Sequence, residues 1–197
     1  MSALTVLVIR HAEKPDRRRP DLGEGLTAEA AIDKHSLVLR GWQRAGTWSA
    51  LFGAGTGGAP DFPKPDIVYA ADPNQPPSED GSRSKRPFQT IAPLCERLHM
   101  RPVTTHGVGD EATLVKEVEQ LSGVVLICWE HKRIVEGILP ELTKAQRLPY
   151  LPTKWDGDRF DVVLRFDRAQ TGAQWSFRQL FPRLLAGDLD VPLSGKE

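Results

Sequence analysis

The sequence LTVLVI at residues 4–9 is a nearly continuous run of apolar, mostly β-branched side chains. Such a run is too short to cross a membrane and is typical of a strand buried on both faces of a sheet. Similar runs occur at residues 67–71 (IVYAA) and 124–129 (VVLICW). We therefore expect residues 4–9 to form a central strand, with the other two runs as further strands of the same sheet.

Helical patterns separate the three runs. Ser36 is expected to cap a helix that ends at Gly53, and an apolar stripe over residues 91–98 predicts a second helix that starts or kinks near Pro93. Asp110 is expected to cap a third helix. Strands that alternate with helices predict a three-layer α/β fold, in which a largely parallel central sheet carries helices on both faces.

The end of the chain has a different pattern. Apolar and polar side chains alternate over residues 160–166 and again over residues 175–177, which predicts a late β-hairpin. Residues 14–21 and 72–85 show little regular pattern and are expected to be loops rather than linkers. We therefore expect residues 1–197 to form a single domain.

The composition is that of an ordinary globular protein. Its 197 residues include 26 lysines and arginines against 26 aspartates and glutamates, so the formal net charge is zero. Such a chain has no overall field to hold nucleic acid or an anionic membrane, and we expect neither as a partner. Cys95 and Cys128 each stand alone, and the first apolar run has neither a basic segment before it nor a cleavage site after it. These features predict a cytoplasmic protein.

Two short motifs have simpler explanations than the functions they suggest. Gly53, Gly55 and Gly58 have the spacing of a dinucleotide-binding loop, but they follow a helix instead of a strand. His11 and Glu13 match half of a zinc-deaminase signature, but no cysteine pair with the required spacing follows. We therefore expect no metal and no other cofactor. A metal-dependent hydrolase is an alternative that the ligand spacing does not support.

Polar side chains follow each of the three predicted strands. Arg10 and His11 come directly after the first strand, and Arg86 lies in the connection that leaves the second. His131 lies just past the third. Because open α/β sheets bind their ligands at the carboxyl ends of the strands, we expect these four side chains to converge.

Two arginines and two histidines at one place suit the handling of a phosphoryl group. Each guanidinium offers two parallel N–H bonds to phosphate oxygens. A neutral imidazole can attack phosphorus in line and form a phosphohistidine, which water then hydrolyses. Nearby positive charge disfavours protonation of that ring, and the second imidazole can stabilise an equatorial oxygen as charge shifts. The pattern therefore predicts a site for phosphoryl transfer.

The same residues carry a family resemblance. Residues 8–13 (VIRHAE) resemble the Arg-His-Gly/Ala-Glu motif of the histidine phosphatase superfamily, which includes phosphoglycerate mutases, fructose bisphosphatases and small bacterial phosphohistidine phosphatases. Residues 37–45 resemble the family's Leu-x-x-x-Gly-x-x-Gln-Ala helix, except that Arg44 replaces the glutamine. Residues 82–90 are similar to the family's Ser-x-x-x-Arg-x-x-Gln-Thr segment, and residues 125–131 resemble the strand that ends in its second pocket histidine. These segments occur in the family's order.

The resemblance implies a role for each residue and a phosphohistidine intermediate. His11 would be the nucleophile, and Arg10 and Arg86 would clamp the phosphate. His131 would be the second histidine of the phosphate pocket, and no metal is implied. Residues 14–17 lack the asparagine that mutases usually carry there, and no mutase donor segment is recognisable after Arg86. A phosphatase is therefore favoured over a phosphoglycerate mutase-like phosphotransferase.

The sequence leaves the proton donor open. Glu13 and Glu130 adjoin expected catalytic positions, and Glu111 lies where donors of the mutase-like branch often occur. Glu111 also begins a predicted helix, where an acid suits the helix dipole. If the chain has no donor, the alternative is a non-catalytic phospho-ligand binding or regulatory module.

The expected substrate is a phosphomonoester, either a phosphorylated small molecule or a phosphoprotein. Arg17, Arg18 and Arg19 lie next to the first motif. Such a run is usually a solvated cluster of charges, but at this place it would also attract a polyanionic substrate. In that case, neutralising the run would raise KM.

Overall fold

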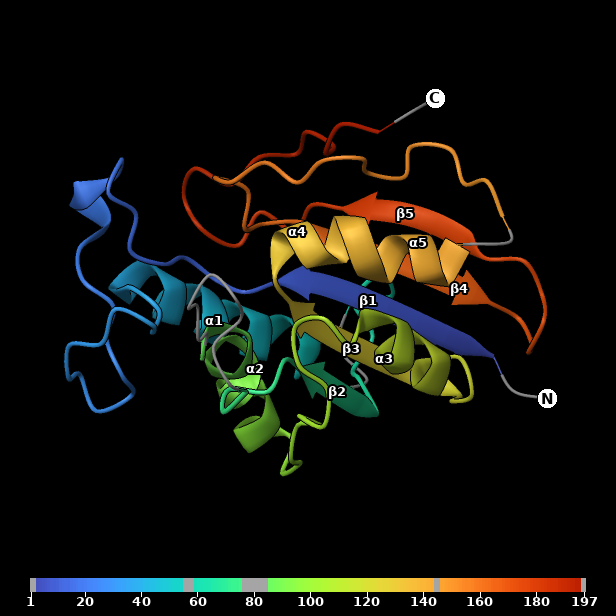
Figure 1. Cartoon of the computed structure of the whole chain (residues 1–197), viewed down its shortest axis with the longest axis horizontal. Helices are drawn as coiled ribbons and strands as arrows, with labels where there is room; N and C mark the ends of the chain where they lie inside the picture. Colours follow the sequence, from blue (N-terminus) through green and yellow to red (C-terminus); the bar gives the residue numbers. More distant parts are fainter. Residues whose placement is uncertain (1–2, 55–58, 76–84, 144–145, 196–197) are drawn as a thin grey trace.

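A computed structural model describes residues 3–54, 59–75, 85–143 and 146–195, and these form a mixed α/β fold (Figure 1). Its five-stranded sheet has the order β2-β3-β1-β4-β5. The strands are β1 (Leu4–Arg10), β2 (Ile67–Ala70), β3 (Gly123–Trp129), β4 (Val163–Arg168) and β5 (Ser176–Leu180). The three apolar runs of the sequence thus form β1, β2 and β3, as predicted.

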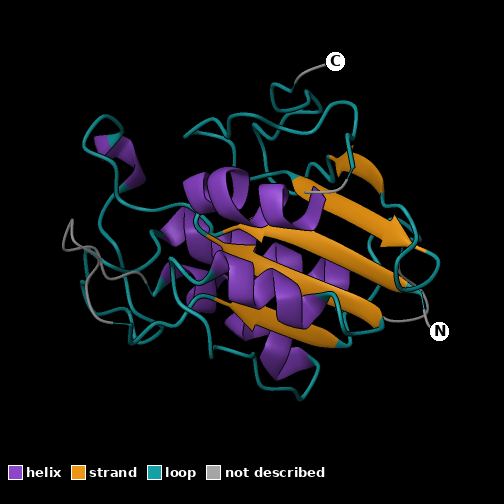
Figure 2. Ribbon diagram, turned by 45° about the vertical axis from the view of Figure 1, so that its right-hand side comes forward, coloured by secondary structure: helices purple, strands orange, loops and turns teal. Residues whose placement is uncertain are grey.

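The sheet is mixed: its centre is parallel, as expected, and the late hairpin adds two antiparallel strands on one side. β1 and β2 both pair with β3 in parallel, so the carboxyl ends of these three strands lie at one edge. The predicted hairpin is present as β4 and β5, and β4 pairs with β1 in the antiparallel direction. The two hairpin strands must run in opposite directions, and together they complete the sheet on the β1 side (Figure 2).

The helices alternate with the strands in the first two thirds of the chain. They are η1 (Pro20–Leu22), α1 (Leu39–Phe52), α2 (Arg86–Arg97), α3 (Glu111–Val118), α4 (His131–Arg133), the π-helical segment η3 (Ile134–Ile138) and α5 (Leu139–Thr143). Sequence periodicity indicated α1, α2 and α3. The continuous helical stretch from α4 through η3 to α5 was not anticipated. No helix among the described residues is long and apolar enough to cross a membrane.

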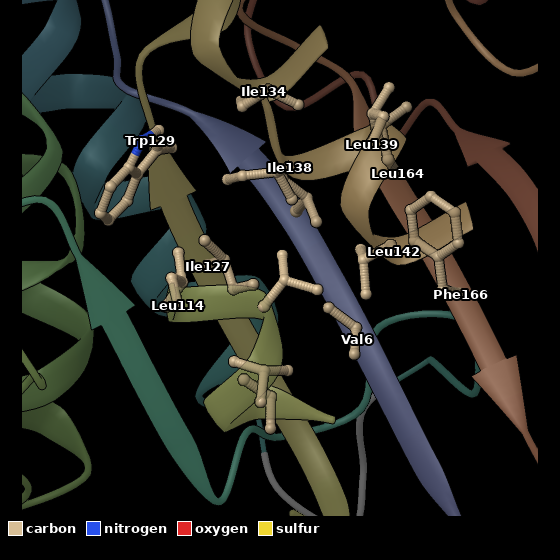
Figure 3. Packing of buried hydrophobic residues seen from close by; sticks show 14 of the residues in the cluster. Val6, Leu114, Ile127, Trp129, Ile134, Ile138, Leu139, Leu142, Leu164 and Phe166 are labelled. Carbon is tan, nitrogen blue, oxygen red and sulfur yellow. The ribbon is translucent and has the colours of Figure 1, made fainter. Parts of the chain in front are cut away.

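Side chains of β1 alternate between two hydrophobic clusters. Val6 and Val8 belong to a cluster that includes residues of α3 and α5, and Leu7 and Ile9 belong to one that includes residues of α1 and α2. Figure 3 shows the first cluster, with Trp129 at its upper left. Because each fully buried aliphatic side chain contributes roughly 1.5–3 kcal/mol, this packing fixes the position of the strand that ends in Arg10.

Two helix starts differ in detail from the expectation. The Ser36 side chain does not cap α1, which begins at Leu39 after Val38. Instead, the Ser36 hydroxyl donates to Asp33 at 2.9 Å and accepts from Gln89 at 2.8 Å. Asp110 does precede α3, but its carboxylate accepts from the Gly107 amide at 3.1 Å and not from the helix. These polar side chains therefore stabilise the loops before the helices.

Proline and glycine have clear positions in the other helices. α2 begins at Arg86, has Pro87 in its first turn and continues through Pro93. Gly137, in the π-helical segment, allows Glu111 to pack against the backbone, because a Cβ there would lie 2.9 Å from the Glu111 Cβ. π-helical turns often occur near functional sites, and this one follows the expected site residue His131.

Candidate functional site at the carboxyl ends of β1 and β3

Arg10 and His131 are brought together by the pairing of β1 with β3. Arg10 is the last residue of β1 and lies opposite Trp129, the last residue of β3. The His11 amide continues this ladder by donating to the Trp129 carbonyl at 3.0 Å. The rings of His11 and His131 consequently lie with their centroids 6.5 Å apart and their planes at 82°. The convergence expected from the sequence is therefore present for these three residues.

His11 is buried and holds a defined tautomer. Its Nδ1 lies 2.8 Å from the Ala12 carbonyl oxygen, which can only accept, so Nδ1 carries the proton. Nε2 is then the nitrogen with the free lone pair. Burial, followed by the positive charges of Arg10 and Arg86, holds the pKa of His11 well below its usual value. His11 is therefore a neutral imidazole with one available nucleophilic nitrogen at neutral pH.

Arg10 is a buried cation whose hydrogen bonds go to carbonyl groups. Its Nη1 donates to the carbonyls of Asp156, Gly157 and Arg159 at 3.1, 2.9 and 2.9 Å. The guanidinium carbon lies 3.9 Å from the centroid of the Phe160 ring. Burial lowers the pKa of Arg10 to about 10, despite attraction from distant carboxylates, so it stays charged at neutral pH. The loop at 156–160 thus orients Arg10 without neutralising it.

Arg86 reaches the same site from the first turn of α2. It donates to the Lys34 carbonyl at 2.9 Å, and its charge acts on the His11 ring. The Thr90 hydroxyl accepts from the Ala12 amide at 2.8 Å and donates to the Arg86 carbonyl at 2.7 Å. One threonine therefore joins the start of α2 to the turn that carries His11.

Gln89, the residue before Thr90 in α2, has a matching role. Its Oε1 accepts from the Leu37 amide at 3.0 Å, and its Nε2 donates to the Ser36 hydroxyl. Gln89 and Thr90 are the last two residues of the segment that resembles the histidine phosphatases. Both side chains connect loops around the site. Ser82, the first residue of that segment, lies outside the described residues.

Glu130 and His131 form a close carboxylate–imidazole pair. Glu130 Oε1 lies 2.6 Å from His131 Nδ1, and Oε2 accepts from the Arg133 amide at 3.0 Å. Burial alone would raise the pKa of Glu130, but the hydrogen bond and charge of His131 and the backbone N–H groups lower it to about 2. The proton between them therefore belongs to Nδ1. The Arg10 Nη2 atom, 3.4 Å from Nδ1, is then a close neighbour and not a donor to it.

Lys14 is a further cation near the site that sequence reasoning missed. It is partly buried and has no hydrogen bond or ion pair with any described residue. Burial and then the charges of Arg86 and Arg10 lower its pKa. Its position three residues after His11 was the available signal, but a single lysine in a loop is not distinctive in a sequence.

Glu13 belongs to a different arrangement of charges. Its carboxylate accepts from Arg44 Nη2 at 2.8 Å, and Arg44 also donates to Asp188 at 2.7 Å. Arg40 Nε lies 3.4 Å from Glu13. Arg44 is the residue that replaces the glutamine of the family pattern, and here it joins the first motif to the C-terminal segment.

Glu111 is buried among neutral donors. Its Oε1 accepts from the Trp129 indole at 2.9 Å and from the Gly109 amide at 3.0 Å. Within the part of the chain that the structure describes, no cation forms an ion pair with Glu111. Of the three candidate donors, Glu111 alone therefore lacks a charged partner.

A cavity of about 330 Å³ adjoins the site on the side of Glu13 and Phe160. The Phe160 ring lies 6.4 Å from that of His11, so one aromatic side chain faces both regions. Four arginines and four acids contribute to the cavity, many of them paired with each other. Its lining consists of Glu13, Arg19, Leu22, Arg40, Arg44, Asp158, Arg159, Phe160, Asp161, Ala186, Gly187, Asp188 and Leu189.

Most of the positive charge of the basic run at residues 17–19, beside the first motif, is neutralised by ion pairs. Arg18 donates to Asp16 at 2.7 Å and Arg19 to Asp21 at 2.9 Å, and both arginine side chains are exposed. The residues flanking the run thus supply a partner for two of its three charges. This arrangement weakens the hypothesis that the run attracts a polyanionic substrate.

A scan against models of protein families and a search of curated proteins found no match to this sequence. Within the described ranges, no group of three or more His, Cys, Asp or Glu side chains is placed to hold a metal ion. Both cysteines are buried and free.

Proposed function

We propose that this protein is a metal-independent phosphatase that hydrolyses a phosphomonoester through a phosphohistidine on His11. The observation that carries the proposal is the buried His11 ring, whose Nδ1 is committed to the Ala12 carbonyl while Arg10 and His131 lie beside it. The resemblance of residues 8–13 and 82–90 to the histidine phosphatases supports the same chemistry. The three-layer arrangement of that family and a cytoplasmic location, which suits two free thiols, are part of the proposal.

The reaction would proceed in two steps. The lone pair of His11 Nε2 forms a bond to phosphorus while the P–O bond to the leaving group breaks, and that oxygen takes a proton from an acid. Water then attacks phosphorus while the P–N bond to Nε2 breaks, and the acid that was deprotonated in the first step takes a proton from that water, which releases inorganic phosphate and restores both the imidazole and the acid. Arg10, Arg86 and Lys14 would bind the phosphoryl oxygens, and His131 would contact an equatorial oxygen as its charge increases.

Glu111 is our candidate for the proton donor. Glu13 is held by Arg44, and Glu130 is held in its charged form by His131, so neither is arranged to carry a proton. If Glu111 is the proton donor, Glu111→Gln will slow the hydrolysis of esters with poor leaving groups far more than that of esters with good ones. Equal losses on both kinds of ester would remove this role.

One observation favours the second candidate function, a phospho-ligand binding module without turnover. All three candidate carboxylates already accept hydrogen bonds within the protein, so none stands free as an acid. Such a module would bind inorganic phosphate at the same residues. It would not hydrolyse any ester.

Hydrolysis of an aryl phosphate in excess chelator, by wild type and His11→Ala, tests the proposal. The phosphatase predicts chelator-resistant activity that is lost in the variant. Loss of wild-type activity on chelation would support a metal-dependent hydrolase instead. Phosphate binding without hydrolysis of a panel of phosphomonoesters would support the binding module.

A further inference from the structure

Glu130 occupies an unusual place for a charged residue, directly after a buried strand and in contact with a site histidine. Its two oxygens have different partners: Oε1 the ring of His131 at 2.6 Å, and Oε2 the Arg133 amide at 3.0 Å. The Glu130 side chain is 26% exposed and that of His131 is 13% exposed. Each oxygen of the Glu130 carboxylate is therefore held by its own partner.

We propose that Glu130 is a positioning residue, which fixes the tautomer and orientation of His131 so that Nε2 meets the phosphoryl group. The inference rests on the proposed function and deepens it, since it assigns to Glu130 a role other than proton donation. In the histidine phosphatase pattern, serine is common at this position, so the sequence resemblance does not supply this role.

The tautomer follows from the contacts of the ring. With the proton on Nδ1 directed to Glu130, Nε2 is the nitrogen left to interact with a ligand. Nε2 has no hydrogen bond to any described residue and is not among the buried atoms without a partner. A ring that donates from Nε2 as well carries a positive charge, which the carboxylate at 2.6 Å offsets.

The neighbouring cation makes this positioning necessary. Arg10 Nη2 lies 3.4 Å from His131 Nδ1, close enough to donate to that nitrogen if it carried no proton. Without Glu130, Nδ1 becomes free to accept a hydrogen bond from Arg10. That exchange would leave the ring neutral, so that it no longer offers a positive charge to the phosphoryl oxygen, and would divert the guanidinium from the phosphate.

Three variants separate this role from the helix cap and from proton donation. Glu130→Asp keeps the charge and an excellent capping group but is one methylene too short to cap and reach Nδ1 together. Glu130→Ala removes both contacts. His131→Asn removes the ring through which Glu130 is proposed to act, and provides the background for a double-mutant cycle.

The cycle is measured as kcat/KM on aryl phosphates with good and poor leaving groups. Glu130→Asp is expected to lower kcat/KM by about 10- to 1,000-fold, to the same extent for all leaving groups, and to have no further effect in the His131→Asn background. An equal loss in both backgrounds, or a loss confined to poor leaving groups, overturns the proposal. Full activity of Glu130→Asp also overturns it, because the cap alone would then be sufficient.

A readout that does not depend on turnover keeps the test separate from that of the phosphatase activity. ¹⁵N NMR of the histidine rings, assigned with His131→Asn, is expected to show a protonated, hydrogen-bonded Nδ1 in wild type that is lost in Glu130→Asp and Glu130→Ala. An unchanged His131 signal in both variants contradicts the proposal. If the protein binds phosphate without turnover, the same double-mutant cycle is measured as the affinity for inorganic phosphate. Glu130→Asp is then expected to lower this affinity but to have no further effect in the His131→Asn background, and an equal loss in both backgrounds contradicts the proposal.

Discussion

Arg10 and Arg44 are both almost fully buried, yet their surroundings differ in kind. Arg44 donates to the carboxylates of Glu13 and Asp188, whereas Arg10 donates to carbonyl groups and forms no ion pair with any described residue. Burial lowers the pKa of both, but the two carboxylates reverse the effect at Arg44 and raise its pKa above the usual value. Removal of a buried cation from its carboxylate partners destabilises the fold, whereas a buried cation without such partners is prepared to bind an anion.

The largest expected effect is a loss of stability on replacement of Arg44, the arginine with carboxylate partners. Arg44→Met leaves two buried carboxylates without their cation and should lower the free energy of unfolding by about 3–5 kcal/mol. Chemical denaturation measures this loss. The affinity of the folded protein for inorganic phosphate should stay the same. A large loss of phosphate affinity at unchanged stability would reverse the roles assigned to the two arginines.

The matched change on the other side is Arg10→Lys. Lysine keeps the charge but cannot reproduce the planar fork, so kcat/KM on an aryl phosphate should fall by about 10²–10³-fold, or about 2.7–4 kcal/mol of transition-state stabilisation. Steady-state kinetics measure the loss. Wild-type kcat/KM in this variant would mean that Arg10 only supports the loop at 156–160.

The charge around His11 should also appear as a pH dependence of stability. The unfolded chain protonates this ring near pH 6.5, but burial and Arg10 keep it neutral in the folded chain well below that pH. As the pH falls below 6.5, the folded state should therefore lose stability by about 1.4 kcal/mol per pH unit from this residue. Between pH 6.5, where the unfolded ring is half protonated, and pH 5.5, denaturation should show that His11→Gln loses about 1 kcal/mol less stability than wild type. Equal slopes would mean that His11 titrates normally.

The smallest effect is expected at the exposed pairs of the basic run. Neutralising Arg18 and Arg19 together removes charges that Asp16 and Asp21 already compensate, so KM for an aryl phosphate and its salt dependence should not change measurably. Steady-state kinetics at low and high salt provide the measurement. A raised KM with a weaker salt dependence would restore the original interpretation of this run.

The sequence predicted the parts of the molecule that depend on local pattern. The apolar runs that became β1, β2 and β3 could be recognised, and parallel pairing then placed Arg10 near His131 at one edge. The stop of α1 at Gly53 follows from local chemistry in the same way. For these elements, the pattern of apolar residues and the position of a glycine were sufficient to predict the structure.

Contacts between distant segments were not predictable. The carbonyls that hold Arg10 come from residues near 156–159, and Asp188 reaches Arg44 across 144 positions. No local pattern specifies such pairs in a single sequence. The same limit explains the sheet, since the direction of β4 relative to β1 depends on the path of the helices between them. For this reason the sequence did not show which side chains contact Glu13 and Glu130, and these contacts decide the roles of the two glutamates.

Trapping of the phosphoenzyme tests the central claim most directly. Wild type and His11→Gln would be mixed with an aryl phosphate, quenched within milliseconds in alkali and digested, and the peptide that contains residue 11 analysed by mass spectrometry. The account predicts an acid-labile, alkali-stable phosphoryl group on His11 of the wild type, formed as fast as the leaving group is released. Leaving-group release with no phosphoryl group on His11, at an equal rate in His11→Gln, would contradict it.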